Sequence, residues 1–245
     1  MIEQEILKKL NSDREFFNKA AIQYGSLDKE HLFNCIMADD AKEKPNNPYV
    51  DLAKRDIIDL IYKQANLEGI AVTYPQTAQL YEGRSVAGLS IEGVVKINNL
   101  KHAWEFILDT LDAEIDFSYL SQVNYFVQAG LRPDAGKLRT QPVTIGGTDW
   151  VPSILSMDEI KQGLIANRLN PLGMCTWLMR SQIFSDGNKR TAQLICNKML
   201  IQRQEGVLAV NPDRLEEFFT LLIAYYEDYT LAPLLDFLES CIITK

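Results

Sequence analysis

The sequence predicts an almost entirely α-helical protein with one small β-hairpin. Apolar residues recur every three or four positions in most segments between glycine and proline breaks, which is the spacing of amphipathic helices. The stretch 130–152 departs from this pattern, because glycine, proline and threonine interrupt it and two short runs flank the turn Gly146-Gly147. Hydrophobic residues make up 47% of the 245 residues, so the chain can bury a sizeable core.

The N-terminal part predicts two helices within residues 3–41, with a break at Gly25 and Ser26. The breaker-rich segment 42–48, with the sequence KEKPNNP, predicts a boundary. We therefore expect an N-terminal helical extension over residues 1–48 and a main domain over residues 49–245. The extension could serve a partner or a dimer contact, or it could belong to the core, and the sequence leaves these alternatives open.

The sequence of the main domain predicts a succession of helices. The clearest is 90–111, where Ile97, Leu100, Trp104 and Ile107 follow the helical period. Its partners are expected at 51–65, 75–81, 117–129, 157–166, 170–179, 192–201, 212–226 and 231–243. The hairpin is expected from a strand over 140–145 and a second strand over 146–152, and it would lie on the helical body because an isolated hairpin is only marginally stable.

Composition excludes several classes of protein. No apolar run approaches the ~18 residues of a membrane span, and a net charge of −8 argues against general binding to nucleic acids or anionic membranes. The acidic N-terminus lacks a signal-peptide pattern, so we expect a cytoplasmic protein. The four cysteines are far apart and form no zinc-binding spacing, which predicts buried free thiols: Cys35, Cys175, Cys196 and Cys241.

The loop 180–191 is the most informative stretch. It joins two apolar helical runs, and the second helix would offer unpaired N–H groups and partial positive charge at its start. Gly187 permits close approach of a ligand, Asn188 can donate to phosphate, and Asp186 can hold Mg²⁺. Lys189 and Arg190 can offset phosphate charge. The residues alone also fit an ordinary helix cap, and the loop contains no Walker A pattern.

Phe184-Ser185-Asp186-Gly187-Asn188-Lys189-Arg190 resembles the signature of the Fic (Fido) family, His-x-Phe-x-Asp/Glu-Gly-Asn-Gly/Lys-Arg-x-x-Arg. Upstream, the runs 136–139 and 143–147, followed by Pro152, resemble the flap region of that family. The resemblance covers roughly residues 50–243. It implies the helical Fic fold with a small hairpin flap.

Fic proteins mostly transfer AMP from ATP to a hydroxyl of a target protein, so the resemblance implies ATP and Mg²⁺ as cofactors and an unknown target protein as partner. Asp186 would be the metal ligand and Arg190 a phosphate clamp, with Phe184 buried beneath the loop. The phosphate-binding residues would be Ser185, Gly187, Asn188, Lys189 and Arg190. The flap residues Val143, Thr144 and Ile145 would hold the target segment by strand pairing.

The sequence departs from the family pattern at the catalytic position. Gln182 stands where the family has its histidine, Ile183 replaces the usual proline, and Gln193 replaces the last arginine. A neutral amide does not titrate and cannot act as a general base, although it could orient a hydroxyl. We therefore expect a transferase-like protein with a degenerate motif, or alternatively a catalytically silent module that binds a nucleotide or a protein. Transfer from a different diphosphate-containing donor is a third alternative that no residue selects.

The family also has an autoinhibitory helix ending in Ser/Thr-x-x-x-Glu-Gly/Asn. Ser90-Ile91-Glu92-Gly93 resembles the end of that pattern, so Glu92 is a candidate inhibitory residue. Gly88 stands where the pattern has Ser or Thr, and an ordinary acidic residue near a helix start is the alternative. Neither a target protein nor an oligomeric state can be named, and a homo-oligomer is left open.

Overall fold

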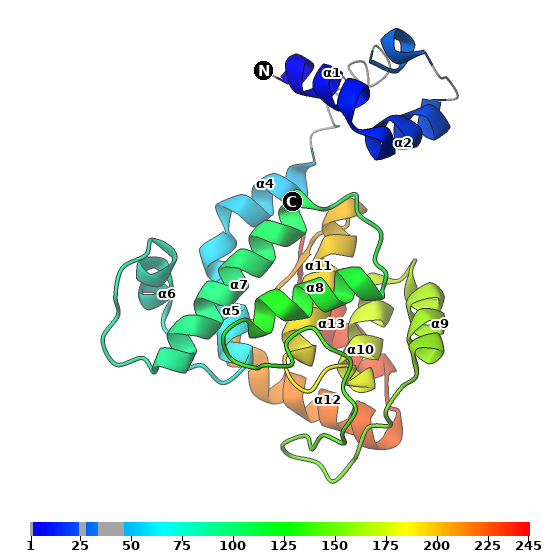
Figure 1. Cartoon of the computed structure of the whole chain (residues 1–245). Coiled ribbons are helices and arrows are strands. Elements are labelled where there is room, and N and C mark those ends of the chain that lie inside the picture. The colour runs from blue at the N-terminus through cyan, green and yellow to red at the C-terminus, as the bar shows by residue number, and fades with distance from the viewer. Residues whose placement is uncertain (1, 25–27, 34–46) are drawn as a thin grey trace. The chain divides into compact units, whose positions relative to one another are not determined.

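The computed structural model describes residues 2–24, 28–33 and 47–245, which divide into two compact units, Met1–Asn46 and Asn47–Lys245 (Figure 1). In the first unit, α1 (Ile2–Ser12) contacts α2 (Arg14–Tyr24). A small core of its own contains Leu10, Ala20 and Leu32. The break predicted at residues 25 and 26, Cys35 and most of the predicted linker lie outside the described residues.

The second unit is helical, which confirms the predicted fold class. Its helices are α4 (Pro48–Arg55), α5 (Ile57–Leu67), α6 (Tyr74–Tyr81), α7 (Ile91–Asp109), α8 (Phe117–Gln128), α9 (Met157–Asn167), α10 (Pro171–Ser181), α11 (Asn188–Gln202), α12 (Leu215–Asp228) and α13 (Ala232–Glu239), with a 3₁₀ turn at Pro212–Arg214. The single helix predicted over 51–65 is wrong in one detail, because a break at Asp56 separates α4 from α5. None of the helices in the described ranges is long and apolar enough to cross a membrane.

The predicted hairpin is wrong. Residues 140–152 form no strand, and the strands found within 47–245 are β1 (Val207–Leu208) and β2 (Ile242–Ile243), paired antiparallel. The turn at residues 146 and 147 does form, and Gly147 has a φ of +86°. Pro142 and Pro152 lack the N–H groups that a ladder needs, and the carbonyls at the base of this segment bond to a side chain instead. β2 also replaces the end of the helix predicted over 231–243.

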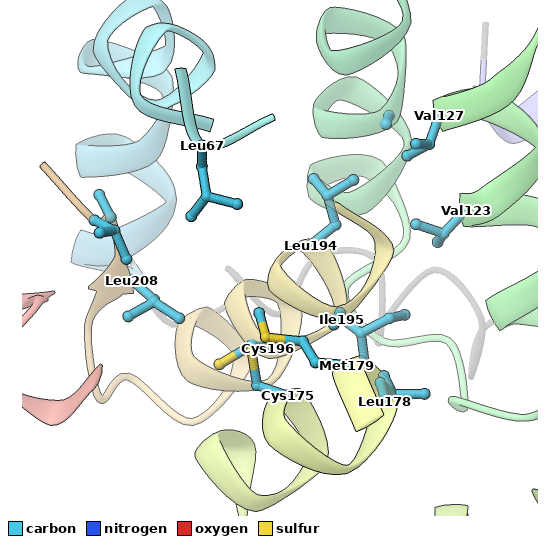
Figure 2. Packing of buried hydrophobic residues seen from close by; sticks show 14 of the residues in the cluster. Leu67, Val123, Val127, Cys175, Leu178, Met179, Leu194, Ile195, Cys196 and Leu208 are labelled. Atoms are coloured by element: carbon cyan, nitrogen blue, oxygen red, sulfur yellow. The ribbon is translucent and has the colours of Figure 1, made fainter. Parts of the chain in front are cut away.

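The core of the second unit is built around α11. All residues of this helix except Lys189 and Gln202 are buried, so it is surrounded by α7, α8, α10 and β1 instead of lying amphipathically on a surface. Figure 2 shows Cys196 of α11 against Cys175 and Met179 of α10, with Val123 and Val127 on the neighbouring α8. Because α11 is central, the loop that precedes it is held by the packed core.

Candidate functional site

Most of the predicted site residues line one cavity of about 490 Å³. One wall is the flap, residues 140–152, which contributes Val143, Thr144 and Ile145. The opposite wall is the motif loop, residues 182–187, together with the start of α11, contributing Gln182, Ser185, Asp186, Gly187, Asn188 and Lys189. Glu68 and side chains of α12, including Tyr226, complete the lining. Arg190 is buried beneath the loop and Glu92 is not among the lining residues.

The motif loop is shaped by two left-handed residues. Gln182 ends α10 with φ 45° and ψ 52°, and Gly187 precedes α11 with φ 76°. A Cβ atom at Gly187 would lie 2.5 Å from Nε2 of Gln128 and 3.0 Å from Cγ1 of Val127. Glycine is therefore required there both for its backbone conformation and for the space beside α8.

The side chain of Asn188 holds the motif loop in shape by bonding to two of its residues. Its Oδ1 accepts from the Phe184 amide at 3.0 Å, and its Nδ2 donates to the Phe184 carbonyl at 2.8 Å and to Oε1 of Gln182 at 3.0 Å. Both Asn188 and Phe184 are buried. The donors that remain for a ligand are the backbone amides of the first turn of α11, since the first N–H groups of a helix have no intrahelical acceptor.

The Gln182 amide is held on both sides. Its Nε2 donates to the Met179 carbonyl at 2.6 Å, while its Oε1 accepts from Asn188. The Tyr226 hydroxyl donates to the same Met179 carbonyl at 3.2 Å, and burial raises the pKa of Tyr226. No histidine is found among the described residues that line the cavity; His102 lies on α7 with its Nδ1 3.3 Å from a carboxylate oxygen of Glu105. Gln182 is thus a buried, oriented and non-titrating group.

Arg190 is paired with a glutamate that sequence reasoning missed. Its Nε lies 3.1 Å from Oε2 of Glu68 and its Nη2 lies 3.8 Å from Oδ1 of Asp186, with the Arg190 side chain 1% exposed. Glu68 Oε1 is also 3.8 Å from Nζ of Lys189. Neither Arg190 Nε nor Glu68 Oε1 makes a hydrogen bond within the described part of the chain, so the contact is electrostatic. Glu68 therefore places a carboxylate beside both Lys189 and Arg190 at the start of α11.

A sequence signal for Glu68 existed. The pair Glu68-Gly69 directly follows α5 and matches the end of the Fic inhibitory pattern as well as Glu92-Gly93 does. Gln64 stands four positions before Glu68, where the pattern has Ser or Thr. Glu92 instead lies in the first turn of α7, where its carboxylate is 2.6 Å from Nζ of Lys96 and 65% exposed. Lys96 lowers the pKa of Glu92. Arg190 therefore forms its close pair with Glu68, whereas Glu92 forms its close pair with Lys96.

Asp186 offers one exposed carboxylate at the loop, with its side chain 49% exposed. Its Oδ1 accepts from the Gly187 amide at 2.6 Å. The described residues contain no group of three or more His, Cys, Asp or Glu side chains able to hold a metal ion. A Mg²⁺ ion that accompanies a nucleotide needs only one or two carboxylates, because phosphate oxygens and waters complete its coordination. The residues present fit that arrangement, with Asp186 as the protein ligand.

The flap is anchored at its base by Arg139, whose guanidinium donates to four carbonyls. The acceptors are Gln182 in the motif loop, Gln141 at 3.0 Å, Pro152 at 3.1 Å and Ser153 at 2.6 Å. The Arg139 amide also donates to the Ile183 carbonyl at 3.1 Å. Arg139 is buried, which lowers its pKa. The run 136–139 resembles the Fic flap region, but the sequence alone indicates no role for the Arg139 side chain.

The other end of the flap rests on α12. Trp150 stacks on Tyr226 with ring centroids 5.2 Å apart, and the Arg180 guanidinium lies 4.4 Å from the Trp150 ring centroid. Thr148 donates to the Glu227 carboxylate at 2.7 Å. Between these supports, no backbone hydrogen bond of residues 143–145 occurs within the described chain. This stretch of backbone without hydrogen bonds is part of the wall of the cavity.

Comparisons of sequence and of structure both find similarity to Fic proteins. No family model matches the sequence. The protein adenylyltransferase Fic of Aedes aegypti is 27% identical over 205 residues, and the match covers 77% of this chain but only 40% of that protein. The chain thus spans about 40% of the length of this curated relative.

Solved structures share the fold. A Fic domain containing signaling protein from Bacteroides thetaiotaomicron superposes with a TM-score of 0.66 at 17% identity, covering 81% of this chain and 87% of that one. Fic-1 from C. elegans gives a TM-score of 0.67 at 18% identity, covering 98% and 78%. The chain is therefore similar in sequence to a Fic protein adenylyltransferase and shares its fold with Fic-domain proteins of known structure.

Proposed function

We propose that this chain binds ATP with Mg²⁺ at the motif loop and transfers AMP to a hydroxyl of a protein segment that lies along the flap. The new bond joins the hydroxyl oxygen to the α-phosphate, pyrophosphate leaves, and the hydroxyl proton passes to solvent. The observation that carries the proposal is the single cavity walled by the motif loop on one side and the flap on the other. The similarity to a protein named as an adenylyltransferase supports the choice of reaction.

The residues divide between the two ligands. The first-turn amides of α11 and the Lys189 side chain, 30% exposed, would bind phosphate oxygens. Asp186 would hold Mg²⁺, which offsets phosphate charge when it is bound. The unbonded backbone of Val143, Thr144 and Ile145 would pair with an extended target segment.

The missing base sets the expected rate. General-base catalysis contributes typically ~10²–10⁴-fold, and the amide of Gln182 cannot take the proton of the attacking hydroxyl. Phosphoryl-type transfer otherwise depends on positioning and on charge stabilisation, which the loop can supply. We therefore propose slow transfer by the wild-type chain, with Gln182 holding the loop in place of deprotonating the target.

A second candidate function is nucleotide binding without turnover. Two observations favour it. The side-chain amide of Gln182 already makes hydrogen bonds within the protein through both its nitrogen and its oxygen, and Glu68 forms an ion pair with Arg190. In this version the bound nucleotide would change which partner the flap accepts, and no group would be transferred.

The test combines binding with transfer. We would measure ATP·Mg²⁺ binding by calorimetry and AMP transfer with α-labelled ATP in a cell lysate for wild type, Gln182→His, Gln182→Asn and Asp186→Ala. The transferase proposal expects binding that depends on Asp186, weak labelling by wild type, and labelling raised ~10²-fold or more by Gln182→His but not by Gln182→Asn. Binding with no labelling by wild type or Gln182→His would favour the silent module, and absence of binding would sink both.

A further inference from the structure

A second hollow of about 890 Å³ lies away from the motif loop, between α9 and the segment 112–118 that leads into α8. None of the residues that line it lines the cavity of the candidate site. Its apolar floor includes the buried side chains of Leu164, Met174 and Met199, from α9, α10 and α11. Methionines adapt to irregular partners, so a floor of this kind suits binding of another apolar group.

One side of α9 forms the first wall. Lys161, Ile165 and Arg168 follow one another at intervals of four and three positions, with Leu169 beside them, so they share one side of the helix and its end. Ile165 is 61% exposed and Leu169 is 70% exposed, although both are large and apolar. No ion pair of Lys161 or Arg168 occurs among the described residues. This wall combines exposed apolar surface with two available positive charges.

The facing wall is acidic, because Asp112, Glu114 and Asp116 line it. Asp112 also lies near Lys198, and the Asp116 carboxylate accepts from the Tyr119 amide at 2.7 Å. We propose that this hollow is a docking groove for an amphipathic segment of a partner protein. The segment places apolar side chains on the methionine floor, acidic residues toward α9 and basic residues toward 112–116. A second copy of this chain fits less well, since its net charge of −8 opposes self-association.

The spacing of the cations defines the partner further. Lys161 and Arg168 are seven positions apart, which along a helix corresponds to about 10.5 Å. A helical partner matches this span with two acidic residues seven positions apart, flanking apolar residues at intervals of three and four. The opposed charged walls fix the direction in which such a helix lies, because turning it round places like charges against each other.

The test uses two fluorescent, helix-stabilised peptides with the same apolar stripe. One has glutamates on the flank facing α9 and lysines on the other flank; in the second peptide the two charges are exchanged. Anisotropy titrations should show the first peptide binding ~10-fold or more tightly than the second. The variant Lys161→Glu/Arg168→Glu should reverse this preference, whereas Ile165→Ser/Leu169→Ser should abolish binding of both peptides.

Two controls separate this inference from other effects. The double variant Lys54→Glu/Lys137→Glu changes the net charge of the protein by the same amount as Lys161→Glu/Arg168→Glu, but at exposed lysines outside the groove. It should leave the preference for the first peptide intact. Asp186→Ala should bind the peptide as wild type does, so failure of the proposed nucleotide chemistry would leave this result untouched. Equal binding of both peptides, no binding of either, or an unreversed preference in a double variant that retains wild-type circular dichroism would overturn the proposal.

Discussion

The motif loop and the flap border the same cavity but are held in opposite ways. The motif loop is fastened by its own side chains, since Asn188 bonds both backbone groups of Phe184 and the amide of Gln182. The flap is fastened at its ends, by Arg139 at the base and by the contact of Trp150 with Tyr226 farther along. Its middle, residues 143–145, has no backbone bonds within the described chain.

This difference suits the two ligands that the cavity is proposed to hold. A phosphate group has one shape, and donors fixed in advance bind it without reorganisation. Target segments differ in sequence and shape, so a wall with free backbone groups can adapt to them, although ordering it on binding costs entropy. The contrast predicts that changes to the loop affect nucleotide binding, while changes to the flap supports affect the mobility of the flap.

The largest effect is expected from Asn188→Ala. The variant loses three hydrogen bonds and leaves buried groups of Phe184 and Gln182 without partners, which should lower the free energy of unfolding by ~2–4 kcal/mol. Because the loop then loses its shape, ATP·Mg²⁺ binding should weaken more than ~100-fold. Urea unfolding and calorimetry measure the two quantities.

Asn197→Ala is a matched control for the loop. Asn197 is also a buried asparagine of α11, and it bonds both backbone groups of Leu208 at 3.0 and 2.7 Å. We expect a similar loss of stability but nearly unchanged nucleotide affinity. If the two variants weaken binding equally, the effect of Asn188→Ala is general destabilisation and the loop is not specially organised.

Arg139→Met should have the next largest effect, chiefly on the flap. The change removes all four guanidinium bonds to carbonyls and should cost ~2–3 kcal/mol of unfolding free energy. Hydrogen exchange of the bonded amides next to the anchor, those of residues 139 and 150, should accelerate much more than exchange in α11. Arg139→Lys should rescue only part of the protection, because one ammonium group cannot span four carbonyls. Unchanged flap exchange in Arg139→Met would contradict the anchoring role.

Glu68→Gln should strengthen nucleotide binding by ~10-fold. The substitution keeps the shape of the side chain and removes a negative charge beside Arg190 and Lys189, where phosphate is proposed to bind. Glu92→Gln is the matched control and should change affinity by less than ~2-fold, since that carboxylate is exposed and paired with Lys96. A larger effect at Glu92 than at Glu68 would restore Glu92 as the inhibitory candidate.

Much of the helical fold was predictable because periodicity is a local property. The positions that marked the long helix, Ile97, Leu100, Trp104 and Ile107, are all buried as their spacing indicates. The hairpin was mispredicted because strand-like composition does not reveal where carbonyl groups find donors. At the base of the flap they bond to Arg139, and a side-chain anchor of this kind has no sequence period.

The candidate site was predictable where its residues stand in short runs that resemble a known motif, such as 143–145 and 182–190. Residues 182–190 stand together in the sequence, so one motif identified the loop. Glu68 reaches Arg190 from α5, more than a hundred residues earlier, and only tertiary packing brings the two together. Tertiary structure also changed the interpretation of Asn188. Its residue type indicated a donor to phosphate, but in the fold its side chain bonds to Gln182 and Phe184 within the loop.

The smallest predicted effect concerns a tether between the loop and the segment before the flap. The Asp134 carboxylate pairs with Arg132 and accepts from the Ser185 hydroxyl at 2.6 Å. The bond with Arg132, followed by the bond with Ser185, lowers the pKa of Asp134 to about 2. A carboxylate pKa that is lowered in the folded state adds stability above its ordinary value near 3.8, and this contribution is lost as pH falls toward 2. The side chain is 39% exposed, so solvent screening limits the effect to less than ~1 kcal/mol.

Asp134→Asn should therefore lower the free energy of unfolding slightly at pH 7. Between pH 4 and pH 2 this free energy should decrease less steeply in the variant than in wild type, as measured by urea titrations across that range. Ser185→Ala should remove part of the same pH dependence in wild type and none in the Asp134→Asn background, because the two groups share one bond. Additive effects of the two substitutions would mean that the bond does not contribute. The shape of the loop would then depend on the bonds of Asn188, Gln182 and Asn124, and its link to the flap on the Arg139 contacts with residues 182 and 183.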